Sequence, residues 1–335
     1  MTMMKIAFFS VNQKEKTYLK RKLGKQYKLD FYTENLTEAN AHLIKDADVI
    51  SVFIYAKVTK KVIDTGKKLK LISARSTGFN HIDHEYAKKK NIAVANVPYY
   101  GENTVAEHTF ALILSLSRKI HKAYVRSIQN NFSLEGLQGF DLRGKTLGVI
   151  GAGSIGVHVM KMAKGFGMNI LAYDVNHNHI LEEVLDFDYV PLEDLLGKSD
   201  IITIHCPYNK HTHHLLNLKN INQVKKGALF INTARSGIIQ SEALYYAIEN
   251  GIFSGAGLDV FEGEELLSEE NQMLTKNVPK ENLEAIWKTN LLLRNENIIL
   301  TPHMAFDSVE AVERILDTTI NNINCFFEKK KFYSV

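Results

Sequence analysis

The chain has 335 residues, a length that favours two domains, and its 45% hydrophobic and 23% charged residues are ordinary for a globular protein. A formal charge of +4 with scattered lysines argues against a nucleic-acid-binding protein. No apolar run is long enough to span a bilayer, the first residues lack signal-peptide features, and the two cysteines lie far apart. We therefore expect a cytoplasmic protein with neither a membrane nor a nucleic-acid partner.

Short β-rich segments alternate with helical patterns along the chain, which favours an α/β protein with parallel sheets. In the N-terminal part, the pattern predicts strands at residues 5–9, 29–32, 48–54, 69–75 and 92–97. A helix is expected around Lys14–Leu23. A single long helix is then predicted over about 103–130, because apolar and small residues recur on one face.

A linker at residues 135–145 leads into a second and more regular α/β run. Its predicted strands lie at residues 146–151, 169–174, 200–206, 227–234, 255–261 and 297–303. Six strands with helical connections between them indicate a complete dinucleotide-binding sheet.

A glycine-rich loop opens this second run. Gly151, Gly153 and Gly156 form the pattern GxGxxG directly after an apolar strand and at the start of a predicted helix. The first glycine permits a tight turn, the second lets the backbone approach a pyrophosphate, and the third allows close contact between helix and strand. A plain glycine-rich turn is the alternative, but the order of strand, helix, second strand and terminal acid argues against it.

The groups around this loop predict NAD as the cofactor. Free amides at Ser154 and Ile155, together with the helix dipole, should face the phosphates. Asp174 ends the second strand and should bind the ribose hydroxyls, and its charge disfavours a 2′-phosphate. The five residues that follow it contain no arginine, so NAD is favoured over NADP.

Three polar residues follow strands of the same domain, at the edge where open α/β sheets bind ligands. They are Arg235, Glu264 and His303. Taken singly, the arginine could be a surface cation, the glutamate a solvated acid and the histidine a packed imidazole. Together they suit the reduction of a 2-oxo acid. An arginine can hold the carboxylate, a histidine can give a proton to the carbonyl oxygen, and a neighbouring carboxylate raises the pKa of a histidine and sets its tautomer.

The ordered motifs resemble those of the NAD-dependent D-2-hydroxyacid dehydrogenase family over nearly the whole chain. They read RSTGFNHID, NVPYYGENTVAEHT, GVIGAGSIG, HCP, NTARSG, GAGLDVFEGE and TPH. The resemblance implies that Arg235, Glu264 and His303 are the catalytic residues. Glu262 and Glu265 are rivals of Glu264, and Glu265 replaces the proline that often follows the family's acid.

Further site residues are implied by the same resemblance. The loop Ser76, Thr77 and Gly78 should offer backbone amides to the substrate carboxylate, with a plain turn as the alternative. Tyr100 should line the substrate pocket, unless it is a core residue. Contacts with nicotinamide and its ribose are implied for Cys206, Pro207, Thr212, Thr233, Ala234 and Asp259.

Five histidines near the predicted site motifs are expected to have structural or solvent roles. These five are His108, His205, His211, His213 and His214. A metal site in the cluster at 211–214 is the alternative, and we expect no metal. Cys206 is expected to line the nicotinamide site as a small apolar side chain and not to act as a nucleophile, because the sequence places no base beside it.

The resemblance also implies an architecture of two Rossmann-like domains, one flavodoxin-like and one dinucleotide-binding, with the active site in the cleft between them. The substrate domain would comprise residues 1–100 and 304–335, and the NAD domain residues 101–303. The long helix would help to form a homodimer.

The preferred substrate is less clearly indicated than the chemistry. The long segment after Glu264 and the PHMAF sequence around His303 favour the D-lactate dehydrogenase branch of the family. Phe306 and Tyr100 would suit the methyl group of pyruvate. Glyoxylate, hydroxypyruvate or a bulkier 2-oxo acid are alternative substrates, and an NAD-sensing corepressor-like binding protein is a rival of another class.

Overall fold

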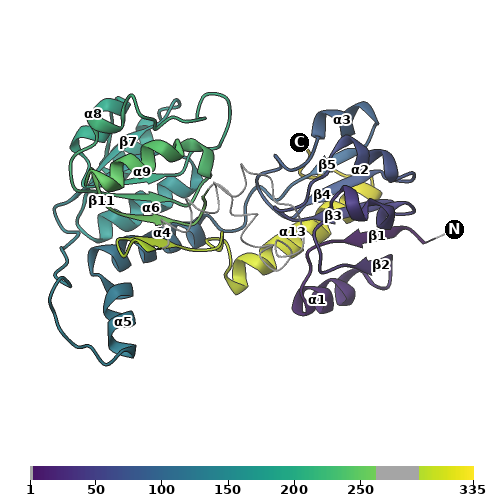
Figure 1. Ribbon diagram of the computed structural model, residues 1–335. Coiled ribbons are helices and arrows are strands. Elements are labelled where there is room, and N and C mark those ends of the chain that lie inside the picture. The colour runs from purple at the N-terminus through teal and green to yellow at the C-terminus, as the bar shows by residue number, and fades with distance from the viewer. Residues whose placement is uncertain (1–2, 262–293) are drawn as a thin grey trace. The chain divides into compact units, whose positions relative to one another are not determined.

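The computed structural model describes residues 3–261 and 294–335. The chain divides into unit 1, Met1–Tyr100 with Ser308–Val335, and unit 2, Gly101–Asp307. Each unit contains one parallel sheet flanked by helices (Figure 1). The chain re-enters unit 1 at Ser308, slightly later than the position 304 expected from the sequence.

The described strands of unit 1 form a sheet of order β2-β1-β3-β4-β5, which is the flavodoxin-like order. Its strands are β1 Lys5–Phe8, β2 Lys28–Phe31, β3 Val49–Val52, β4 Leu71–Ala74 and β5 Ala93–Ala95. Its helices are α1 Gln13–Leu23, η1 Glu38–Ile44, α2 Lys60–Thr65, α3 His84–Lys89 and α13 Val309–Phe327.

Alternating side chains explain why this sheet is covered on both faces. Ile6 and Phe8 of β1 pack with apolar residues of α1 and α13, whereas Ala7 and Phe9 belong to a second cluster with η1, α2 and α3. All four side chains have no exposed surface. A strand whose two faces are both buried needs apolar residues on each face, and after Lys5 β1 contains only apolar residues.

The described strands of unit 2 form a sheet of order β12-β11-β10-β9-β6-β7-β8. Renumbered within the unit, this is the dinucleotide-binding order 3-2-1-4-5-6 with a seventh strand added. Its strands are β6 Thr146–Ile150, β7 Asn169–Tyr173, β8 Asp188–Tyr189, β9 Ile201–Ile204, β10 Ala228–Asn232, β11 Phe253–Leu258 and β12 Ile298–Leu300. The sequence pattern does not predict β8, because a strand of two residues is too short to show an alternation of apolar and polar side chains.

Helices lie on both faces of the unit 2 sheet. The described helices of this unit are α4 Glu102–Ser117, α5 Ile120–Ile128, α6 Ser154–Gly165, α7 His179–Leu185, α8 Leu192–Lys198, η2 Ile221–Gln223, η3 Ser236–Ile238 and α9 Ser241–Glu249. Buried residues of α4 and α6 form one core cluster with the sheet, and those of α8 and α9 form the other. None of the helices in the described ranges is long and apolar enough to cross a membrane.

The single long helix predicted over 103–130 is two helices. The helix α4 ends at its C-cap Arg118, and Lys119 has a left-handed backbone with φ of 54°. A left-handed residue cannot continue a right-handed helix, so α5 starts anew at Ile120. Figure 1 shows α5 extending away from the sheet that α4 covers.

Candidate functional site

In the glycine loop after β6, two glycines lie so close to neighbouring backbone atoms that a side chain would not fit. Gly151 has φ of +101°, and a Cβ built on it would lie 2.5 Å from the Cys206 nitrogen. A Cβ on Gly156 would lie 2.1 Å from the Gly151 carbonyl oxygen, so α6 can approach the strand only without a side chain there. The loop therefore brings the N-terminus of α6, with its unpaired first amides, to the carboxyl edge of the sheet.

The remaining loop glycine marks the space in which a pyrophosphate would fit. A Cβ on Gly153 would meet nothing within 4 Å, so this position needs no glycine for packing. Gly153 is also the N-cap of α6, directly before Ser154 and Ile155. Open space over the N-terminus of a helix suits a pyrophosphate, so the residues present fit NAD.

Asp174 lies at the end of the neighbouring strand, with its carboxylate held by backbone amides. The Ala152 amide donates to Oδ2 and the Asn176 amide donates to Oδ1, both at 2.8 Å. Because Ala152 belongs to the glycine loop, this bond ties the acid predicted to bind ribose to the loop predicted to bind the phosphates.

Arg235 follows β10 in a loop that is braced by Asn232. The Asn232 side chain accepts a hydrogen bond from the Ala234 amide and donates one to the Arg235 carbonyl, both at 3.0 Å. The Arg235 guanidinium is half-buried and donates to the Ala234 carbonyl oxygen at 2.7 Å. Asn232 is a positioning residue that the sequence analysis missed, although it lies inside the motif NTARSG.

His303 lies beyond β12 in a left-handed backbone conformation, with φ of 53°. Its amide donates to the Asp259 carbonyl at 3.0 Å and to the Thr301 carbonyl at 2.9 Å. A non-glycine residue in this region is uncommon and is held only by its surroundings. Strained backbones of this kind are frequent at functional sites.

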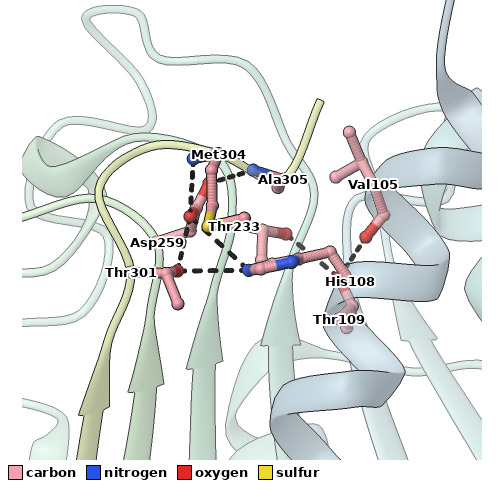
Figure 2. A network of polar contacts seen from close by, with 8 residues as sticks. All are labelled: Val105, His108, Thr109, Thr233, Asp259, Thr301, Met304 and Ala305. Carbon is pink, nitrogen blue, oxygen red and sulfur yellow. Dashed lines mark hydrogen bonds and ion pairs between the residues drawn. The ribbon is translucent and has the colours of Figure 1, made fainter. Parts of the chain in front are cut away.

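Asp259 is the residue that holds the His303 loop. Its side chain is fully buried and accepts hydrogen bonds from the Thr301 hydroxyl at 2.5 Å and from the Met304 and Ala305 amides at 2.9 Å (Figure 2). Thr301 and Met304 flank His303 on either side. Whatever contact Asp259 makes with a cofactor, its carboxylate also fixes the backbone around the imidazole.

His108 of α4 completes this network, which fits the structural one of its two predicted roles. Its Nε2 atom lies 3.1 Å from the Thr301 hydroxyl and 3.5 Å from Asp259 Oδ1. The Thr301 hydrogen is used on Asp259, so His108 Nε2–H is the donor to Thr301. Figure 2 also shows Thr109 beside Thr233, whose hydroxyl oxygens are 3.1 Å apart.

The loop after β9 is lined by uncharged groups. Burial raises the pKa of the Cys206 thiol to about 11, so it is a neutral wall and not a nucleophile. Burial lowers the pKa of His205 to about 3, and its Nε2 lies 2.8 Å from the Thr203 hydroxyl. Thr212 closes the next turn by donating to the Pro207 carbonyl at 2.6 Å.

The alternative of a metal site in the histidine cluster finds no support. His213 and His214 are stacked with ring centroids 3.8 Å apart, and the Tyr208 hydroxyl lies 3.0 Å from His213 Nδ1. Within residues 3–261 and 294–335, no group of three or more His, Cys, Asp or Glu side chains could hold a metal ion.

In unit 1, the loop after β4 turns two neighbouring carbonyl groups toward the segment after β5. The Ser76 carbonyl accepts from the Val97 amide at 3.1 Å, and the Thr77 carbonyl accepts from the Asn96 side chain at 2.9 Å. Carbonyl and amide of a trans peptide point in opposite directions, so the Thr77 and Gly78 amides face away from these partners. Neither amide donates to another group of the described residues.

The predicted substrate-pocket residues Tyr100 and Phe306 lie in different units, and the predicted catalytic acid is not among the described residues. Tyr100 in unit 1 and Phe306 in unit 2 are both half-buried. Glu264, with its rivals Glu262 and Glu265, lies outside the described residues. In unit 2 the structure therefore gathers the glycine loop, Asp174, Arg235 and His303 at strand ends of one sheet.

Comparisons with known proteins agree with this chemistry. The family model described as D-isomer specific 2-hydroxyacid dehydrogenase, NAD binding domain, matches residues 110–305. A 2-hydroxyacid dehydrogenase homolog of Haemophilus influenzae is 37% identical over 96% of this chain and 95% of that protein. The D-lactate dehydrogenase of Escherichia coli is 36% identical over 96% of both chains. The crystal structure of D-lactate dehydrogenase from Aquifex aeolicus with NAD and lactic acid is 39% identical, with a TM-score of 0.87, over 97% of this chain and 96% of that chain.

Proposed function

Because the chain belongs to the NAD-dependent D-2-hydroxyacid dehydrogenase family, oxidoreductases that act on a CH–OH group, we propose that it interconverts pyruvate and D-lactate. NAD is its cofactor. The substrate assignment goes beyond family membership, since relatives at similar identity carry only the general name of 2-hydroxyacid dehydrogenase.

One observation carries the chemical part of the proposal. The glycine loop, Asp174, Arg235 and His303 follow β6, β7, β10 and β12, which are parallel strands of one sheet. Ligands of such sheets bind outside the carboxyl ends of the strands. A cofactor cradle, a cation and an imidazole therefore share one edge of unit 2.

Each of these groups has a defined task in the proposed reaction. The bound cofactor supplies or accepts the hydride. Arg235 holds the substrate carboxylate and polarises the carbonyl through its planar fork. His303 donates a proton to the carbonyl oxygen while the carbonyl carbon receives the hydride, and Glu264 orients its imidazole. Oxo acid, NADH and one proton thus give the hydroxy acid and NAD⁺.

Within unit 1, the loop after β4 offers backbone amides that can bind a carboxylate, and we propose it as a carboxylate site of that unit. The Thr77 and Gly78 amides have no acceptor among residues 3–261 and 294–335, and adjacent backbone amides of this kind can bind an anion. Half-buried Phe306 of unit 2 would contact a small apolar side chain of the substrate. The relatives named D-lactate dehydrogenase support the methyl group of pyruvate as that side chain.

The proposal is tested by following NADH absorbance with a panel of 2-oxo acids under identical conditions. We expect kcat/KM to be highest with pyruvate. A far higher value with glyoxylate or hydroxypyruvate would replace the assignment by a reductase for that acid. Tight NADH binding without turnover of any acid would instead support an NAD-sensing binding protein.

We also propose that the protein is a homodimer joined through α5 and the segment after it. Large apolar side chains are exposed there, including Tyr124, Ile128, Phe132 and Leu134. Apolar patches of this kind mark protein contacts. Analytical ultracentrifugation should give a dimer that Phe132→Asp and Leu134→Asp dissociate, and a monomeric wild type would contradict the proposal.

A further inference from the structure

Asn96 connects the end of β5 to the loop of the proposed carboxylate site. It is buried and makes three hydrogen bonds within unit 1. Its amide donates to the Tyr333 carbonyl at 3.2 Å, and its carbonyl accepts from the Asn322 side chain at 2.9 Å. Its own side-chain amide donates to the Thr77 carbonyl at 2.9 Å. The two bonds to its backbone therefore hold Asn96 in place, and its side chain is free to bind the Thr77 carbonyl.

A second buried asparagine fixes the first. Asn322 of α13 has no exposed surface, and its Oδ1 atom accepts from the Tyr333 amide at 3.1 Å while Nδ2 donates to Asn96. Both ends of its side-chain amide are therefore occupied, which sets the orientation of that amide. Helix α13 and residue 333 therefore hold the Asn96 backbone in the place from which its side-chain amide reaches the Thr77 carbonyl.

The bond from Asn96 determines where one peptide plane points. The Thr77 carbonyl and the Gly78 amide belong to the same trans peptide, so fixing the carbonyl toward Asn96 turns the amide the opposite way. The rest of the loop is held independently, because Thr77 Oγ1 donates to the Val97 carbonyl at 2.8 Å and the Ser76 hydroxyl donates to the Gly78 carbonyl at 2.7 Å.

We propose that Asn96, braced by Asn322, is a positioning residue that aims the Gly78 amide at the substrate carboxylate. This inference rests on the proposed function, since it assumes that the loop receives a carboxylate. It assigns to Asn96 a contribution to the binding of the 2-oxo acid and none to the binding of NADH or to proton transfer. A merely structural residue would affect all three.

The test compares Asn96→Ala and Asn96→Asp with the wild type in steady-state kinetics. For Asn96→Ala we expect the KM for the 2-oxo acid to rise about fivefold, the factor that one net hydrogen bond is worth. The Ki of oxamate, an unreactive isostere of pyruvate, should rise by the same factor. The values of kcat and of the Kd for NADH should stay within about twofold, the pattern for lost uniform binding. Asn96→Asp should raise KM further, because a carboxylate oxygen would face the Thr77 carbonyl and repel the substrate.

Two further variants separate positioning from general damage. Asn322→Ala should raise KM in the same direction as Asn96→Ala, because it frees the Asn96 backbone. Asn324→Ala is the matched control, since Asn324 lies on the same helix but accepts from the Tyr27 hydroxyl at 3.2 Å, away from the loop. Its KM should equal that of the wild type.

The inference is overturned if folded Asn96→Ala has an unchanged KM and Ki, or if kcat and the Kd for NADH change as much as KM. Thermal unfolding of each variant identifies those that fail to fold, and Asn322→Ala then provides the same comparison. Either of these two contradicting results leaves the wild type an active 2-oxo acid reductase, so the proposed function would stand. A wild type that neither reduces a 2-oxo acid nor binds oxamate would overturn the proposed function, and this inference with it.

Discussion

Substitution of Gly153 by alanine should separate cofactor binding from folding. The position has φ of −75° and a Cβ there would meet nothing within 4 Å. Alanine should therefore leave the free energy of unfolding unchanged or raise it by about 0.4–1 kcal/mol, because it restricts the unfolded chain. The added methyl group would occupy the space of the pyrophosphate. We expect the Kd for NADH to rise at least about tenfold, equivalent to about 1.4 kcal/mol.

Gly151→Ala provides the opposite case in the same loop. With φ of +101° and a Cβ only 2.5 Å from the Cys206 nitrogen, alanine is strained and overlaps backbone. Backbone strain alone costs about 1–3 kcal/mol, so the protein without cofactor should unfold at a clearly lower temperature.

The assays are NADH fluorescence titration and thermal unfolding in the absence of NADH. The reasoning would be refuted if Gly153→Ala bound NADH as tightly as the wild type. It would equally be refuted if Gly153→Ala lost stability as Gly151→Ala does, since the space at Gly153 would then not be open in the folded protein.

Four further predictions concern the site. Thr301→Val removes the hydroxyl between His108 and Asp259 and should lower the free energy of unfolding by about 2 kcal/mol. Thr301→Ser keeps a hydroxyl and should not lower it. Equal urea midpoints for the two variants would contradict this prediction. Burial lowers the pKa of His205 from 6.5 to about 3, so the unfolded chain binds more protons between these values. Stability should fall as pH drops through this window, and His205→Asn should flatten the acid-unfolding curve; an unchanged curve would argue against a buried neutral imidazole. Because burial raises the pKa of Cys206 to about 11, iodoacetamide should alkylate it much more slowly in the folded than in the unfolded protein, as read by peptide mass spectrometry. His303→Ala should lower kcat about 10²–10⁴-fold with an unchanged Kd for NADH, and lost NADH binding would make the residue structural.

The cofactor site could be predicted from the sequence because its requirements are local. A glycine pattern after an apolar strand, with an acid at the end of the next strand, specifies a turn, a helix start and a ribose contact within one stretch of chain. The structure adds the reason for each glycine. Gly151 and Gly156 are needed for backbone packing, whereas Gly153 leaves open space.

Features set by distant contacts could not be predicted in the same way. The carboxylate of Asp259 reads as one acid in a strand, and only the fold brings the Thr301 hydroxyl and the Met304 and Ala305 amides to it. The break at Lys119 likewise has no glycine or proline to announce it. The link from Asn322 through Asn96 to the Thr77 carbonyl joins residues that are far apart in the chain.

The most direct test of the proposed reaction is to incubate the protein with pyruvate and NADH and to determine the configuration of the product by chiral chromatography. We predict one molecule of D-lactate for each NADH oxidised. Formation of L-lactate, or no oxidation of NADH at any pyruvate concentration, would contradict the assignment.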